Sequence, residues 1–265
     1  MNTKNFERTD MSAVTISFQM FSSREEVDLE TQLRLLAELG LKDVQPFFFE
    51  LPGSMQEVET YASLLERYGL TAESGHFTLS QFETAPDQVE KIAKTLGMWL
   101  VVDPYISPED RPSTAAGWDA YGARLAEVSR DMAARELTFA YHNHEFEMER
   151  LPDGSYPLDR LLGKDVALEP DLAWMIVGGA DPLEFLEKYA GRIPAVHVKD
   201  MAPKGTCLDE KGFADLGYGT MDWEALWPRC LDLGARIMVL EHDQPADWRR
   251  FATRSVTAAH RIARR

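Results

Sequence analysis

The chain has 265 residues, and its hydrophobic content of 45% is enough to bury the core of one α/β barrel domain or of two small domains. Its 28 basic and 44 acidic residues give a formal charge of −16, which repels phosphate backbones and makes nucleic acid an unfavourable partner. Two cysteines without metal or redox spacing, and no run of about 18 apolar residues, predict a cytoplasmic protein that has no membrane partner.

Short β-rich runs alternate with amphipathic stretches along the whole chain, which is typical of repeated βα units and a parallel sheet. Eight strands are expected, at residues 14–20, 43–47, 71–76, 98–103, 137–142, 166–170, 193–198 and 236–241. The pattern predicts a single (β/α)8 TIM barrel domain over residues 1–265, in which residues 1–12 form a flexible or peripheral segment.

Helices are expected between these strands wherever apolar residues recur on one face. The predicted helices cover residues 24–39, 54–68, 86–96, 114–135, 182–189, 223–233 and 247–263. Gly40 and Gly69 are expected to end the first two, and Asp181 and Asp222 to cap two later ones.

Two segments interrupt the repeat. Residues 145–159 contain the turn signal Pro152-Asp153-Gly154, which predicts a hairpin or an excursion after the fifth strand that could roof a site. Residues 201–220 are rich in Gly, Lys and Asp and follow the seventh strand, where barrel enzymes often contact their substrates.

Four of the expected strands end next to a side chain that can bind a metal. These side chains are His142, Asp171, His197 and Glu241. The carboxyl ends of the strands of a parallel β/α protein share one crevice, so the four are expected to lie close together. Two imidazoles and two carboxylates suit Mn²⁺, Fe²⁺, Co²⁺ or Zn²⁺ better than Ca²⁺, which prefers oxygen ligands.

A resemblance supports this hypothesis. The segments YHNHEFEM, EPDLAWM, GGADPLEFLEKYAGRIPAVHVKDM, GYGTMDW and VLEHD together resemble the sugar phosphate isomerase/epimerase family of xylose isomerase-like TIM barrels. GLKDVQPF and ESGHFTL stand where that family has its second and third strands. The resemblance implies one divalent cation, often Mn²⁺, Co²⁺, Mg²⁺ or Zn²⁺, with ligands at the ends of strands five to eight. These positions correspond to His142, Asp171, His197 and Glu241, and we favour Mn²⁺.

The strand-five position departs from the family pattern. Many relatives have Glu there, whereas this chain has His142 within His142-Asn143-His144. Alternation along a strand would send His144 to the same side as His142, where it could bind the metal, contact substrate or orient a ligand.

Other polar residues complete the expected site. His76, His144, Lys199 and Gln45 are candidates for substrate binding because they stand at or near strand ends and carry hydrogen-bonding or charged groups. Glu241 and His142 are the candidate catalytic residues, and Glu147 is a third that could act as a base. Each also has a structural interpretation, since lone polar groups at strand ends more often cap or tie loops.

The expected chemistry is proton abstraction next to a sugar carbonyl, through an enediolate that a divalent metal stabilises. Returning the proton to the opposite face would epimerise the sugar, and returning it to the adjacent carbon would isomerise it. Epimerising relatives use paired carboxylates at strands five and eight, so His142 also favours a keto-sugar or keto-inositol dehydratase or lyase as the alternative.

Two further classes remain open. A non-catalytic sugar-binding barrel is possible because fold alone does not establish catalysis. The endonuclease branch of the superfamily is disfavoured by the charge of −16 and the single apparent site. A small sugar is the expected partner, with or without phosphate, and the barrel could form a homodimer.

Overall fold

The computed structural model describes residues 14–26 and 28–264, so the expected segment 1–12 lies outside the described residues. The eight strands of the barrel are all parallel to their neighbours and lie close to the expected positions. They are β1 (Thr15–Phe18), β2 (Phe47–Phe48), β3 (Ser74–Phe77), β4 (Leu100–Asp103), β5 (Thr138–His142), β6 (Ala167–Glu169), β7 (Ala195–Val198) and β10 (Ile237–Leu240). The predicted α/β barrel is therefore confirmed.

The hydrogen-bonded ladder divides into two arcs, ordered β1-β10-β7 and β2-β3-β4-β5-β6. Single parallel bridges join the arcs at two seams, Gln19 to Gln45 and Asp171 to His197. At the second seam the His197 amide donates to the Pro170 carbonyl at 3.0 Å. The closure of the barrel thus brings two of the expected metal ligands together.

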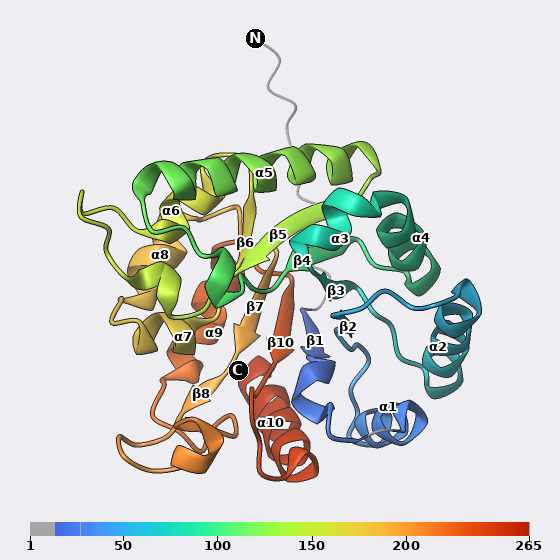
Figure 1. Ribbon diagram of the computed structural model, residues 1–265. Coiled ribbons are helices and arrows are strands. Elements are labelled where there is room, and N and C mark those ends of the chain that lie inside the picture. Colours follow the sequence, from blue (N-terminus) through green and yellow to red (C-terminus); the bar gives the residue numbers. More distant parts are fainter. Residues whose placement is uncertain (1–13, 27, 265) are drawn as a thin grey trace.

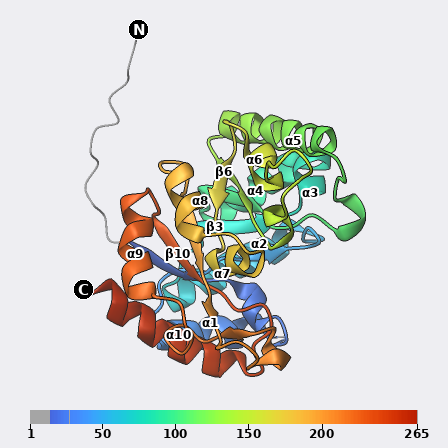
Figure 2. The ribbon, with the colours of Figure 1, turned by 90° about the vertical axis from the view of Figure 1, so that its left-hand side faces the viewer.

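The helices surround the strands, and α5 (Ala115–Ala134) and α10 (Trp248–Ala263) lie on opposite sides of the barrel (Figures 1 and 2). The remaining helices are α1 (Leu29–Glu38), α2 (Met55–Tyr68), α3 (Leu79–Thr84), α4 (Pro86–Leu96), α6 (Pro157–Leu162), α7 (Leu172–Val177), α8 (Pro182–Lys188) and α9 (Trp223–Asp232). None of the helices in the described part of the chain is long and apolar enough to cross a membrane.

Three of the residues expected to end or cap helices do so. Gly69 ends α2 in the left-handed conformation with φ 63°, and the side chains of Asp181 and Asp222 cap α8 and α9. The start of the first helix was predicted too early, because the Asp28 side chain accepts from the Thr31 amide and so begins α1 at Leu29.

Of the hairpin or excursion expected after β5, the structure has the excursion. It contains a 3₁₀ turn, Phe146–Met148, then a turn at Pro152-Asp153-Gly154, where the Gly154 amide donates to the Leu151 carbonyl at 2.8 Å, and then α6, which begins at Pro157. Pro at the first helical position starts a helix readily because its missing N–H is not needed there. After β7, a short antiparallel pair, β8 (Asp200–Met201) and β9 (Phe213–Ala214), replaces the expected irregular loop in part.

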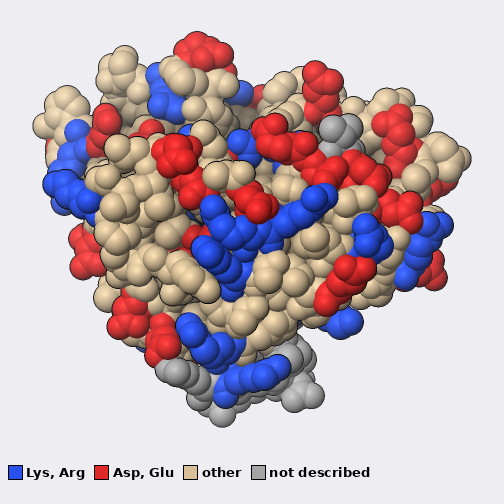
Figure 3. Space-filling view, turned by 90° about the horizontal axis from the view of Figure 1, so that it is seen from below, with Lys and Arg blue, Asp and Glu red and all other residues tan. Residues whose placement is uncertain are grey.

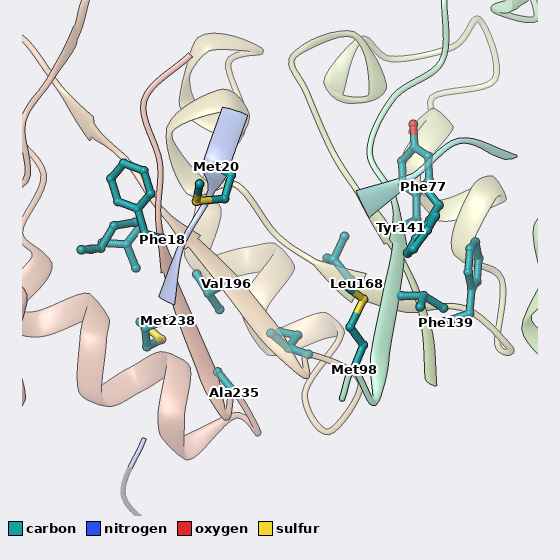
Figure 4. Packing of buried hydrophobic residues seen from close by; sticks show 14 of the residues in the cluster. Phe18, Met20, Phe77, Met98, Phe139, Tyr141, Leu168, Val196, Ala235 and Met238 are labelled. Atoms are coloured by element: carbon teal, nitrogen blue, oxygen red, sulfur yellow. The ribbon is translucent and has the colours of Figure 1, made fainter. Parts of the chain in front are cut away.

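Two apolar layers hold the barrel. The layer between strands and helices is the larger one, and Figure 4 shows part of it, with Phe18, Val196 and Met238 near β1, β7 and β10, and Phe139, Tyr141 and Leu168 near β5 and β6. The second layer comprises Leu100, Val102, Ala140, Ala195, Ile237 and Val239. Alternation places His142, His197 and Glu241 two residues after members of this second layer, on the same side of their strands.

Candidate metal centre and its surroundings

The four expected metal ligands lie together at the carboxyl ends of β5, β6, β7 and β10. His142, Asp171, His197 and Glu241 are all buried, and one ligand atom of each lies within 4.8 Å of the others. Asp171 also caps α7, because its Oδ1 accepts from the Trp174 amide at 2.9 Å. The bond from the Asp171 amide to Asn143 Oδ1 (3.0 Å) ties the end of β6 to the segment after β5.

The residues present fit a divalent ion. The Nδ1 atom of His142 is buried and has no hydrogen-bond partner among the described residues; its ion-pair neighbour, Glu169 Oε2, lies 3.7 Å away. Burial lowers the pKa of His142 well below its usual range, and the nearby His197 and His144 lower it further. A neutral imidazole with an unused nitrogen is a ready metal ligand.

The other imidazole is held between two carboxylates. His197 Nδ1 lies 2.7 Å from Glu241 Oε2, and His197 Nε2 lies 3.1 Å from Glu169 Oε2. Burial alone would lower the pKa of His197, but Glu169 and Glu241 outweigh it and raise the pKa to about 10. An ion bound by His197 and Glu241 would therefore replace a proton that the two residues share.

Lys199 is a buried cation inside this cluster. Its Nζ lies 2.7 Å from Asp171 Oδ2, 2.9 Å from Glu241 Oε2 and 2.6 Å from Asp243 Oδ2. Burial favours the neutral amine, yet the three carboxylates raise the pKa of Lys199 well above its usual range. Lys199 therefore stays charged and contacts two of the four candidate ligands.

The two carboxylates among the candidate ligands, Asp171 and Glu241, have opposite pKa shifts. Burial raises the pKa of Asp171 to about 6 although Lys199 opposes the shift. Burial also acts on Glu241, but Lys199 and His197 prevail and hold its pKa well below the usual range. Glu241 is thus the carboxylate that remains ionised and borders the cavity above the cluster.

A second group, which the sequence argument missed, lies beside the first. Glu169 is two residues before Asp171, and it accepts from Gln45 Nε2 at 2.7 Å and lies 2.7 Å from His76 Nε2. His76, Glu169 and His197 could also hold an ion. The alternation in LEPD, which puts Glu169 on the same side as Asp171, was the signal that could have identified it.

The other expected site residues have varied positions. His76 and His144 border the cavity, together with His142 and Glu241. Gln45 is buried and contacts Gln19, Ser74, Glu169 and His197, so it belongs to the network beside the metal cluster and does not border the cavity. Burial lowers the pKa of His144 to about 3, so its side chain is neutral. Its buried Nδ1 has no hydrogen-bond partner in the described part of the chain.

Glu147 is placed to stabilise the segment after β5, and not to transfer a proton to a substrate. Its Oε1 accepts from the Tyr141 hydroxyl at 2.5 Å and its Oε2 from the His144 amide at 2.9 Å. Burial raises its pKa to about 8, and it does not border the cavity. Glu147 was expected near the site, but from the turn at Phe146–Met148 its carboxylate accepts from the Tyr141 hydroxyl of β5 and from the His144 amide just after β5.

Comparisons with known proteins agree with this fold. A family profile described as xylose isomerase-like TIM barrel matches residues 33–257. The chain belongs to this family. A sugar phosphate isomerase/epimerase from Parabacteroides distasonis has the same fold, with a TM-score of 0.77 and 19% identity over 99% of this chain and 98% of that one.

Two further proteins that are similar to this chain carry different names. The probable 3-DHS dehydratase AsbF of Bacillus anthracis superposes with a TM-score of 0.73 and 13% identity, over 93% of this chain and 98% of that one. The rhizopine catabolism protein MocC of Rhizobium meliloti is 31% identical over 104 residues, which are 38% of this chain. The match spans only 30% of the length of that curated relative.

Proposed function

We propose that this xylose isomerase-like barrel is a divalent-metal-dependent sugar isomerase or epimerase that removes a proton next to a carbonyl. The observation that carries the proposal is the set of four buried ligand atoms within 4.8 Å of one another, two of whose residues border a cavity. His142, Asp171, His197 and Glu241 would hold the ion, for which we favour Mn²⁺.

The bound ion would polarise the substrate carbonyl and stabilise the negative charge that develops when the neighbouring C–H loses its proton. Glu241 is the proposed base, since its low pKa keeps it ionised and it borders the cavity. His76 and His144 would hydrogen-bond sugar hydroxyls from the same cavity. Lys199 would balance the charge of Asp171 and Glu241.

A dehydratase or lyase is the second candidate, and His142 is the observation that favours it. Epimerisation needs groups on both faces of the substrate, whereas the strand-five position here has an imidazole in place of a carboxylate. Elimination needs one base and one acid, which Glu241 and a nearby imidazole or ammonium could supply. The dehydratase among the structural neighbours shares the fold.

Proton NMR in D₂O tests the proposal. Chelator-treated protein is restored separately with Mn²⁺, Co²⁺, Mg²⁺, Fe²⁺ or Zn²⁺ and incubated with a panel of keto-sugars and keto-inositols. We expect metal-dependent loss of the C–H signal beside the carbonyl, and the product spectrum separates isomerase, epimerase and lyase. Glu241→Gln should lose this exchange, whereas Asp43→Asn, a buried carboxylate at the opposite end of the barrel, should keep it. Absence of exchange with every metal would leave a sugar-binding barrel.

A further inference from the structure

The cavity above the metal cluster has a polar floor and an aromatic rim. Its volume is about 330 Å³, and fifteen residues border it. The floor is formed by His76, His142, His144, Glu241 and Asp243, and the rim includes Phe21, Phe47, Phe48, Phe49, Tyr105 and Trp174. The chemistry proposed above uses the floor alone, so the rim has no role in it.

One part of the rim is a cluster of three phenylalanines: Phe21, which follows β1, Phe47, which begins β2, and Phe49, which follows β2. The ring centroids of Phe21 and Phe47 lie 5.4 Å apart, those of Phe21 and Phe49 lie 5.7 Å apart, and those of Phe47 and Phe49 lie 5.1 Å apart, all edge to face. Phe49 is 57% exposed, which is unusual for a large apolar side chain beside a polar site.

The other part of the rim consists of Tyr105, which follows β4, and Trp174, which follows β6; both contact His144 of the floor. Tyr105 and His144 lie edge to face with centroids 5.0 Å apart, and Trp174 is 5.4 Å from His144. Tyr105 is 41% exposed. Because both parts of the rim border one cavity, a molecule bound on the polar floor has aromatic surface available beyond its reacting end.

Apart from the proposed ion, the side chains around the cavity offer an anionic group few partners. Three acids, Glu145, Glu241 and Asp243, border the cavity, and Lys211 is the one lysine or arginine among the described residues that line it. Two nearby arginines have other partners. Arg24 lies over the Phe21 ring at 3.8 Å and donates to the Phe21 carbonyl, and Arg111 lies over Phe146 and donates to the Tyr105 hydroxyl.

The surface gives a phosphate little further attraction. The chain has a formal charge of −16, and the face viewed from below has acidic and basic side chains side by side among large uncharged areas (Figure 3). The positive charge of the buried Lys199 is balanced by the three carboxylates that it contacts.

We infer that the substrate is an uncharged glycoside of a keto-sugar, whose reacting ring carries its ketone on the polar floor and whose second ring, aryl or glycosyl, stacks on the aromatic rim. This inference rests on the proposed function for the reacting end, and it adds the substrate class. A second ring with a flat apolar face explains the exposed Phe49 and Tyr105, which a small free sugar on the floor would leave in water.

Calorimetric binding to the Mn²⁺-loaded protein tests the inference. The probes are matched methyl and phenyl glycosides of glucose, galactose and mannose, each oxidised to the ketone at one ring carbon, the corresponding ketones of cellobiose and lactose, and glucose 6-phosphate. For at least one sugar, the phenyl glycoside should bind about 2- to 12-fold more tightly than its methyl counterpart. Comparison of phenyl glycosides with disaccharides shows whether the second ring is aryl or glycosyl.

Phe49→Ala should remove most of the phenyl preference. The matched control is Tyr218→Ala, an aromatic residue that is 60% exposed but does not border the cavity, and it should keep the preference. Equal affinities within every methyl and phenyl pair, absence of binding by all glycosides, or tighter binding of glucose 6-phosphate would each overturn the inference. If the binding test fails but metal-dependent C–H exchange is observed, the proposed function is still supported. If the phenyl preference is observed without exchange, the proposed function is contradicted, but binding of a second ring at the rim is supported.

Discussion

The two ends of the barrel contrast in what they bury. Toward the amino end, the interior contains the aliphatic layer of Leu100, Val102, Ala140, Ala195, Ile237 and Val239. At the carboxyl end, the same alternation presents imidazoles, carboxylates and a lysine, all buried. Aliphatic burial stabilises a fold, whereas burial of charges costs free energy unless each has a partner. A barrel that keeps so many charges at one end does so for binding or chemistry.

The largest expected effect is at the carboxyl end. Asp171→Ala should lose the bound metal and lower the exchange activity by on the order of 10³-fold or more, because metal stabilisation of the developing charge is worth several kcal/mol. Elemental analysis of chelator-free protein measures the metal, and circular dichroism checks the fold. Retention of metal in a folded Asp171→Ala protein would contradict the assignment.

Lys199→Met tests whether the lysine balances the buried acids. Without metal, its unfolding free energy should fall by about 3–5 kcal/mol, because Asp171, Glu241 and Asp243 lose their buried counter-charge. Added Mn²⁺ should stabilise the variant more than the parent protein, since the ion supplies the missing positive charge. Urea unfolding with and without chelator measures both effects.

The control for this comparison is Lys188→Met. Lys188 pairs with Asp159 at 2.6 Å, but its side chain is half exposed, so its removal should change stability by at most about 1 kcal/mol. If Lys199→Met were as stable as Lys188→Met in chelator, the buried lysine would have no balancing role.

Glu169→Gln should have a smaller effect on the metal. One glutamine oxygen cannot accept from Gln45 and also satisfy both His76 and His197, so His197 would lose one of the groups that orient it and keep its contact with Glu241. We expect metal affinity to fall by about 10- to 100-fold, as is typical of residues that orient a ligand. Glu73→Gln, which changes an acid bonded to Thr15 and Trp99 at the amino end, should leave the affinity unchanged. Complete loss of metal in Glu169→Gln would instead indicate an ion in the group of His76, Glu169 and His197.

The smallest effect on the metal centre is expected for Asp43, near the amino end. Burial raises its pKa from the usual 3.8 to about 7. Its folded-state pKa lies above its unfolded value, so the unfolding free energy should decrease as pH rises from about 4 to about 7, by at most about 4 kcal/mol, and then level off. Asp43→Asn should lack this decrease while keeping metal affinity. Parallel pH profiles of unfolding for the two proteins would contradict the prediction.

Strand periodicity made most of the fold predictable. The eight short apolar runs and the caps at Asp181, Asp222 and Gly69 are local signals, and the structure has elements at each. The helices α3, α6 and α7 were missed because each spans only six residues, too few to show a period. The antiparallel pair of β8 and β9 depends on contacts between residues distant in the sequence.

The site was predictable only in part, for a related reason. Metal ligands at strand ends follow from fold geometry, and the structure brings His142, Asp171, His197 and Glu241 together. The burial of Lys199 among three acids, the network around Glu169 and the inward turn of Glu147 depend on how side chains from different strands meet. The partners in these contacts lie on different elements, so no local pattern in the sequence predicts the contacts.

Anomalous diffraction from crystals loaded with Mn²⁺ or Co²⁺ locates the bound ion itself. We expect one strong peak about 2.0–2.2 Å from ligand atoms of His142, Asp171, His197 and Glu241, and no peak at the amino end of the barrel. A peak among His76, Glu169 and His197 alone, or no peak at the carboxyl end at saturating metal, would contradict this expectation.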